Sequence, residues 1–132
     1  MPHLQFEINR HISDEDKRSF ADAVRALFAG IMDTGTDHIS ISVRECGTYD
    51  ISLGRVSKPS QGVALINADL RQGRTIEQRR ELALGFLDLL HKHFKIPHAN
   101  MYVTFTEHQG EDFHLIERYL ADWKKGEDPL AD

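Results

Sequence analysis

The second residue of the sequence carries the most unusual candidate chemistry. Pro2 follows Met1 directly, and if Met1 is removed the proline nitrogen becomes a free secondary amine. An α-amino group titrates at about pH 7.7–8.0 in water, so near neutral pH it can either accept or donate a proton. Most proteins that begin with Met-Pro make no chemical use of the proline, so the rest of the sequence decides whether a site forms around Pro2.

Two arginines are the second candidate group. Residues 69–75 read DLRQGRT, which places Arg71 and Arg74 between a buried strand and a long helix. The planar donors of arginine match a carboxylate, and a helix N-terminus adds free N–H groups and a positive dipole end. The alternative is that both arginines are solvated or pair with Asp69 or Glu77 at the surface. On this segment alone, the surface role is the simpler interpretation.

Clear periodicities predict the elements that must position these groups. Leu4, Phe6 and Ile8 alternate with polar residues, which is typical of a strand over residues 3–9. Ser13 followed by three acids predicts the start of a helix over 14–32. The remaining predicted elements are strands at 38–46, 51–53, 63–68 and 101–106, and helices at about 75–94 and 113–123.

The order of these elements predicts one α+β domain over residues 1–132. We expect an α/β two-layer fold of tandem β-α-β units, in which a four-stranded mixed sheet carries two helices on one face. Residues 2–60 form the first β-α-β unit, residues 61–107 the second, and residues 108–132 a C-terminal helix and tail. The opposite face of such a sheet needs a cover, and oligomerisation is the simplest solution.

Composition narrows the classes of partner and location. The formal net charge of −5 argues against nucleic acid or an anionic membrane as a partner. No apolar run reaches transmembrane length and no signal-peptide pattern is present. The single cysteine, Cys46, excludes an internal disulfide and fits a cytoplasmic location. Eight histidines are present, but His91 and His93 point to different faces of their predicted helix, so we expect no metal site.

Taken together, these features resemble the tautomerase superfamily of N-terminal-proline enzymes. Met-Pro-His-Leu at the start, and the stretch from Leu70 through His93 and Phe94, are most similar to 5-carboxymethyl-2-hydroxymuconate isomerases. The pair of Arg71 and Arg74 resembles the carboxylate-binding arginines of cis-3-chloroacrylic acid dehalogenases and malonate semialdehyde decarboxylases. The resemblance covers about residues 2–107.

The resemblance implies an enzyme of aromatic catabolism that acts on a small carboxylate substrate without a cofactor. It implies a homotrimer with active sites near the subunit interfaces. Pro2 becomes the catalytic residue, Arg71 and Arg74 bind the substrate carboxylate, and Arg44 is a looser match to an isomerase arginine. Arg44 and Thr104 are assigned to substrate binding together with the arginine pair. Because Thr104 stands where the dehalogenases have a tyrosine, the resemblance argues against hydrolytic dehalogenation.

Three hypotheses for the function remain open. A neutral Pro2 would be the general base of an isomerase or tautomerase that moves a proton in a 2-hydroxymuconate- or 2-oxo-acid-like substrate. A cationic Pro2 would instead be the general acid of a decarboxylase, hydratase or dehalogenase. The third hypothesis is a non-catalytic oligomeric binding protein. Both catalytic hypotheses require the removal of Met1.

Overall fold

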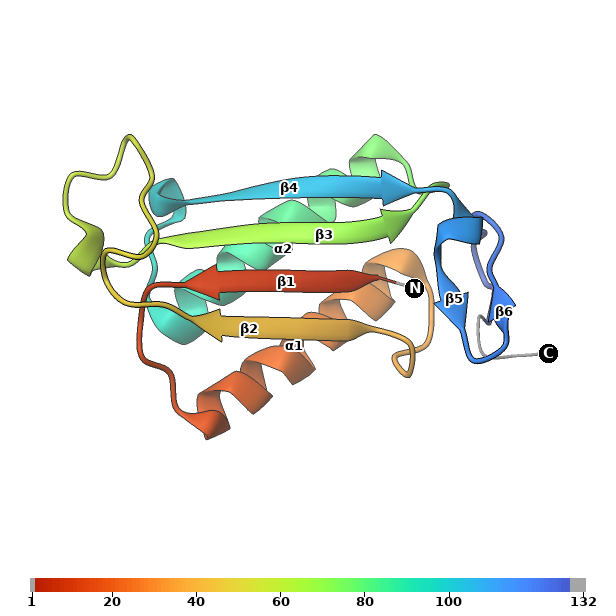
Figure 1. Ribbon diagram of the computed structural model, residues 1–132, viewed down its shortest axis with the longest axis horizontal. Helices are drawn as coiled ribbons and strands as arrows, with labels where there is room; N and C mark the ends of the chain where they lie inside the picture. Colours follow the sequence, from red (N-terminus) through yellow and green to blue (C-terminus); the bar gives the residue numbers. More distant parts are fainter. Residues whose placement is uncertain (1, 129–132) are drawn as a thin grey trace.

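The computed structural model describes residues 2–128, which form a four-stranded sheet with two helices packed on one face (Figure 1). Strands β1 and β2 are parallel, β3 and β4 are parallel, and β1 and β3 pair antiparallel in the order β2-β1-β3-β4. This architecture confirms the predicted fold class. The elements are β1 (His3–Ile8), α1 (Asp14–Met32), β2 (Ser40–Glu45), β3 (Ala64–Arg71), α2 (Ile76–Phe94) and β4 (Met101–His108).

Both helices begin at the residues that the sequence signals predict. The Ser13 side chain accepts a hydrogen bond from the backbone N–H of Asp16 and caps α1. Thr75 and Gln78 form a reciprocal capping box at the start of α2. Because Thr75 follows Arg74 directly, this cap also fixes where the arginine segment meets the helix.

The core lies between the two helices and the sheet. Leu4, Phe6 and Ile8 of β1 are fully buried on the face that the helices cover. The Phe6 ring packs edge-on against Phe20 of α1 at 5.0 Å and against Phe86 of α2 at 5.3 Å, measured between ring centroids. Strand β1 is therefore packed against both helices.

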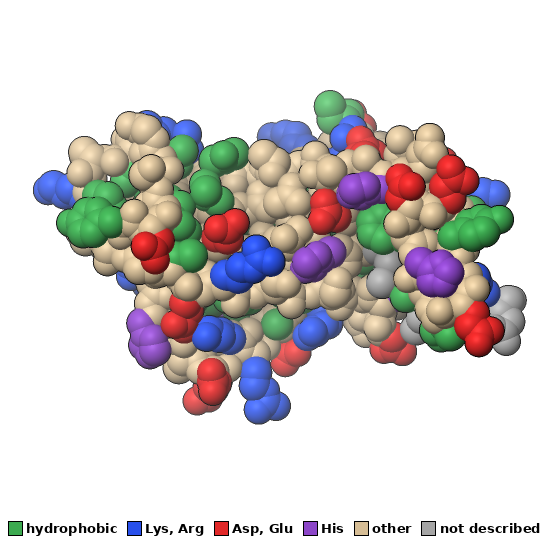
Figure 2. All heavy atoms as spheres, viewed as in Figure 1, with side chains coloured by type: hydrophobic (Ala, Val, Ile, Leu, Met, Phe, Trp, Pro, Cys, Tyr) green, Lys and Arg blue, Asp and Glu red, His purple; other side chains and the backbone are tan. Residues whose placement is uncertain are grey.

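The other face of the sheet is polar and carries a network of side-chain hydrogen bonds. His3 and Ser42 are joined at 2.7 Å, and Gln5 donates to the Asp69 carboxylate at 2.9 Å. Figure 2 shows this face, on which polar and charged side chains are mixed with scattered hydrophobic ones. No element of residues 2–128 covers it (Figure 1).

The predicted C-terminal helix at 113–123 is wrong. In its place are a short 3-10 turn at Gly110–Asp112 and a small hairpin of β5 (His114–Leu115) and β6 (Arg118–Tyr119). Ile116 has a φ of 57°, which a helix does not tolerate, and the backbone N–H of Leu120 donates to Phe113 O across the hairpin. The segment bonds across this hairpin and, through the backbone N–H of Trp123, to Gln72 O just beyond the end of β3, and these bonds replace those of a helix. Met1 and residues 129–132 lie outside the described residues.

The predicted strand at 51–53 is also wrong. The backbone N–H groups of Asp50 and Val56 donate to Gly47 O and Leu53 O, so the segment lies between two turns. Its one clear apolar contribution is Ile51, whose side chain is buried. Three residues between turns leave no room for a ladder with a neighbouring strand.

Candidate functional site

Pro2 is fixed to the sheet at the start of β1. The residue is buried, and its carbonyl accepts hydrogen bonds from the backbone N–H of Ser40 at 3.2 Å and from the Ser40 hydroxyl at 3.0 Å. These two bonds join Pro2 to the first residue of β2, which runs parallel to β1. The proline nitrogen is therefore held at one end of the sheet and not on a loose tail.

The arginine segment leaves the sheet at this same end. His3 pairs with Asp69 in the antiparallel register, so the chain enters β1 where it leaves β3. Arg71 is the last residue of β3, and its side chain is 1% exposed; that of Arg74 is 5% exposed. The structure therefore excludes the alternative of two solvated surface arginines.

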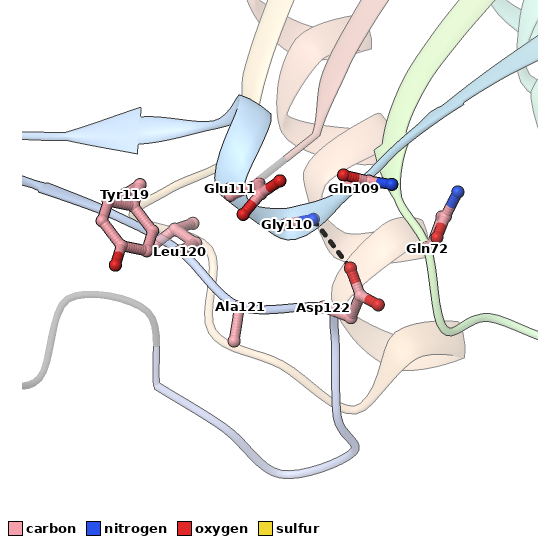
Figure 3. A pocket seen from close by; sticks show the side chains of 8 residues that line it. All are labelled: Gln72, Gln109, Gly110, Glu111, Tyr119, Leu120, Ala121 and Asp122. Atoms are coloured by element: carbon pink, nitrogen blue, oxygen red, sulfur yellow. Dashed lines mark hydrogen bonds between the residues drawn. The ribbon is translucent and has the colours of Figure 1, made fainter.

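The arm, defined here as residues 110–128, crosses over this end of the sheet (Figures 1 and 3). The backbone N–H of Trp123 donates to Gln72 O at 2.8 Å, and that of Gly110 donates to the Asp122 carboxylate at 2.7 Å. Gly73 has a φ of 126°, and a Cβ placed on it would lie 2.4 Å from the Trp123 carbonyl oxygen. Only glycine allows the arm to approach the arginine segment this closely. A cavity of about 540 Å³ opens between the arm and Gln72 (Figure 3).

The arm supplies the partners of both arginines. Arg71 donates through Nη1 to Ala121 O at 2.6 Å and through Nη2 to the Glu127 carboxylate. Arg74 donates through Nη1 to Arg71 O at 3.0 Å, and its guanidinium lies 4.8 Å from the Trp123 ring centroid. Burial, followed by the positive charge of Arg71, lowers the pKa of Arg74 to about 10. Arg74 still carries its charge at neutral pH.

His38 is a site residue that sequence reasoning missed. It lies two residues before Ser40, its side chain is 7% exposed, and its Nε2 is 3.4 Å from the Thr34 hydroxyl. Burial, followed by the positive charges of the amino terminus, Arg71 and Arg74, lowers the pKa of His38 to about 4. The imidazole is therefore neutral at pH 7. One signal was available: His38 stands just before the strand that runs parallel to the strand of Pro2.

A cavity of about 450 Å³ lies beside His38 and reaches the arm at Glu127 and Asp128. It is lined on the other side by the loop that follows α1, including Gly35 and Thr36. This end of the sheet thus brings together a buried proline, a buried neutral histidine, two buried guanidinium groups and one carboxylate. Such a set of groups can bind an anion and exchange a proton with it.

Arg44 and Thr104 do not join this cluster within one chain. Arg44 is exposed and pairs in register with Glu7, which is five residues along β1 from Pro2, or about 17 Å at 3.3 Å per residue. Thr104 lies on the open face, midway along the edge strand β4, where its hydroxyl donates to the Asn67 side-chain oxygen at 3.0 Å. Their predicted role in substrate binding stays a prediction.

Within residues 2–128, no group of three or more His, Cys, Asp or Glu side chains could hold a metal ion. None of the helices in that range is long and apolar enough to cross a membrane.

Comparisons with known proteins agree with the predicted resemblance to tautomerases, whereas the finer resemblance to 5-carboxymethyl-2-hydroxymuconate isomerases stays a prediction. The family model for tautomerase enzymes matches residues 65–122, which include both arginines and most of the arm. No curated protein matches the sequence.

Solved structures share the fold. A wild-type fused 4-OT asymmetric trimer is 21% identical, with a TM-score of 0.77 over 89% of this chain and 94% of the other. A member of the cis-3-chloroacrylic acid dehalogenase family is 19% identical, with a TM-score of 0.81 over 94% and 85%. A malonate semialdehyde decarboxylase inhibited by 3-bromopropiolate is 19% identical, with a TM-score of 0.70 over 84% and 86%. The chain therefore has the tautomerase fold, and its second half matches the tautomerase family.

Proposed function

We propose that this chain is a cofactor-independent tautomerase of the tautomerase superfamily, with Pro2 as its general base after removal of Met1. The proposed substrate is a 2-hydroxymuconate- or 2-oxo-acid-like carboxylate, as for 5-carboxymethyl-2-hydroxymuconate isomerases. The proposal is carried by one observation: Pro2 directly precedes β1 at the end of the sheet where β3 leads into the segment of the two buried arginines. The single cysteine suits a cytoplasmic enzyme of aromatic catabolism.

The proposed reaction moves one proton and changes no oxidation state. The neutral amine of Pro2 takes a proton from a 2-hydroxy group or from the carbon next to a 2-oxo acid, which leaves a dienolate. The protonated amine then returns that proton to a carbon further along the conjugated chain. Arg71 and Arg74 hold the carboxylate and stabilise the negative charge of the dienolate. Their positive charges also favour the neutral form of a nearby amine.

Assembly into a homotrimer belongs to the same proposal. No element of the described residues 2–128 covers the polar open face, and the fused 4-OT structures with this fold are trimers. In a trimer, a neighbouring copy would bring Arg44 or Thr104 to the edge that carries Pro2. This arrangement would place the active sites near subunit interfaces and would give both residues their predicted role.

A second candidate function uses the same site, but Pro2 donates a proton instead of accepting one. A cationic Pro2 would act as a general acid in a decarboxylation, hydration or dehalogenation. The TM-scores of 0.81 and 0.70 to a dehalogenase-family member and a decarboxylase favour keeping it open. The pH dependence of the rate separates the two, because activity rises with pH through the titration of a base and falls through that of an acid.

The test is a turnover assay on protein whose N-terminus has been confirmed by intact mass. The assay panel contains 2-hydroxymuconate, a 2-hydroxydienoate and phenylenolpyruvate. We expect Pro2→Ala and Arg74→Ala to abolish turnover, and Arg18→Ala, which removes an exposed arginine of α1, to leave it unchanged. A non-cleavable N-terminal extension should also abolish turnover, because it converts the amine into an amide. Full activity in Pro2→Ala would falsify the proposal and favour a non-catalytic binding protein.

A further inference from the structure

Both terminal nitrogens of Arg71 are already engaged by the arm. Nη1 donates to Ala121 O, and Nη2 forms an ion pair with the Glu127 carboxylate. The Arg71 side chain is 1% exposed and the Glu127 side chain is 25% exposed. A ligand that needs Arg71 must therefore displace a carboxylate that belongs to the chain itself.

Arg74 is different, because one complete side of its guanidinium has no partner. Nη1 donates to Arg71 O, whereas Nε and Nη2 are buried and make no hydrogen bond within residues 2–128. These two nitrogens form the planar fork that accepts a carboxylate through two parallel hydrogen bonds. The Trp123 and Phe28 rings lie 4.8 Å and 5.6 Å from the guanidinium carbon, so the two nitrogens without a partner are buried beside apolar rings.

The charges of the site also favour a single ligand carboxylate. Arg71 and Arg74 contribute two positive charges, and Glu127 contributes one negative charge that pairs with Arg71. Glu107 is close enough to raise the pKa of Arg74, but its carboxylate is already paired with Arg79 at 2.6 Å. Within residues 2–128 no carboxylate forms an ion pair with Arg74, so one ligand carboxylate can balance its charge. A buried charge is costly unless it is paired, so this imbalance favours the binding of a single anion.

We propose that Glu127 is the specificity-determining residue that makes this a site for a monocarboxylate. Glu127 occupies Arg71 as an internal carboxylate, and the free fork of Arg74 binds the one carboxylate of the ligand. A dicarboxylate can use both arginines only after it displaces Glu127 and the end of the arm. This inference narrows the proposed function: Arg74 alone binds the substrate carboxylate, which favours a 2-oxo-acid-like substrate with one carboxylate over 2-hydroxymuconate, which has two. It rests on that function only in taking the arginine segment as the place where substrate binds.

The test compares two inert six-carbon dienes by calorimetry. Sorbate and muconate share the conjugated diene, but sorbate has one carboxylate and muconate has two. We expect the wild type to bind sorbate more tightly than muconate. Glu127→Gln should shift the ratio of the two affinities toward muconate by about tenfold. This is the effect expected when the charge-assisted hydrogen bond from Arg71 to Glu127 no longer competes with the second carboxylate of muconate. Glu117→Gln removes an exposed acid from the same arm and should leave the ratio unchanged.

Several results would overturn the inference. One is an affinity ratio that is equal in the wild type and in Glu127→Gln. Another is loss of sorbate binding in Glu127→Gln, which would make Glu127 part of the ligand site instead of a competitor. Tighter wild-type binding of muconate, or no binding of either diene, would overturn it as well. Because no turnover is measured, these outcomes are independent of the Pro2→Ala test of the proposed function. Thermal unfolding of Glu127→Gln checks that the variant is folded.

Discussion

The buried His38 makes the stability of this protein depend on pH in a defined window. Its pKa falls from 6.5 to about 4 on folding. Between these two values the unfolded chain binds a proton that the folded chain does not bind. The free energy of unfolding therefore decreases as the pH falls through the window, and below about pH 4 the loss is complete.

The size of the effect follows from the pKa difference. A tenfold change in proton affinity is worth about 1.4 kcal/mol, so the full window corresponds to about 3 kcal/mol. At about pH 4.5 most of that loss, about 2.5 kcal/mol, has already occurred. The cause is burial first and the positive charges of the amino terminus, Arg71 and Arg74 second.

Urea unfolding followed by far-UV circular dichroism measures this effect. The wild type and His38→Gln are compared at about pH 7.5 and about pH 4.5, at one protein concentration. The wild type should lose about 2.5 kcal/mol more than His38→Gln between the two conditions, because the contributions of all other groups cancel in the difference. His114→Gln, which changes an exposed histidine of the arm, should behave as the wild type does. Equal pH dependence in the wild type and His38→Gln would refute the reasoning.

Three further predictions concern the arm, the core and a helix cap. Gly73→Ala should release the arm, seen as a red shift in the fluorescence of Trp123, the only tryptophan, whereas Gly54→Ala has open space for its methyl group and should show no shift. Phe86→Ala removes a fully buried ring between β1 and α2 and should lower the free energy of unfolding by about 3–5 kcal/mol in a denaturant titration. Thr75→Ala removes the cap of α2 and should lower it by about 1 kcal/mol, so equal stability of this variant and the wild type would contradict the capping argument.

The sheet and its helices could be predicted because their signals are local. Leu4, Phe6 and Ile8 alternate as a half-buried strand must, and all three are fully buried. Ser13 and Thr75 mark helix starts through bonds to residues only three positions away. Where two strand-helix-strand units follow one another, the handedness of the crossover then decides the topology.

The arm and His38 could not be predicted because their contacts are distant in sequence. Arg71 bonds to Ala121 and Glu127, which lie 50 and 56 positions further along the chain. No local pattern in the arm reveals these partners. The spacing of its aromatic residues also fits a helix, which is not the structure that forms. His38 gains its properties from burial and from charges on other strands, which become visible only when the strands are assembled. The roles of Pro2, Arg44 and Thr104 stay predictions.

The two strand-helix-strand units have the same dimensions. His3 pairs with Ser40 and Ala64 pairs with Met101, so both crossovers advance the chain by the same number of residues, and both helices have 19 residues. Because β1 and β3 are antiparallel, an approximate two-fold axis passes between them, and one inner strand starts at each end of the sheet. At the far end the nitrogen before β3 belongs to Val63 and is an amide that donates to the Asn9 side chain at 2.6 Å. The symmetry therefore offers two equivalent positions, and the start of the chain makes only one of them a potential base. A circular permutant that begins at Val63 would carry its free α-amine at the opposite end of the sheet, where the arginine pair is absent.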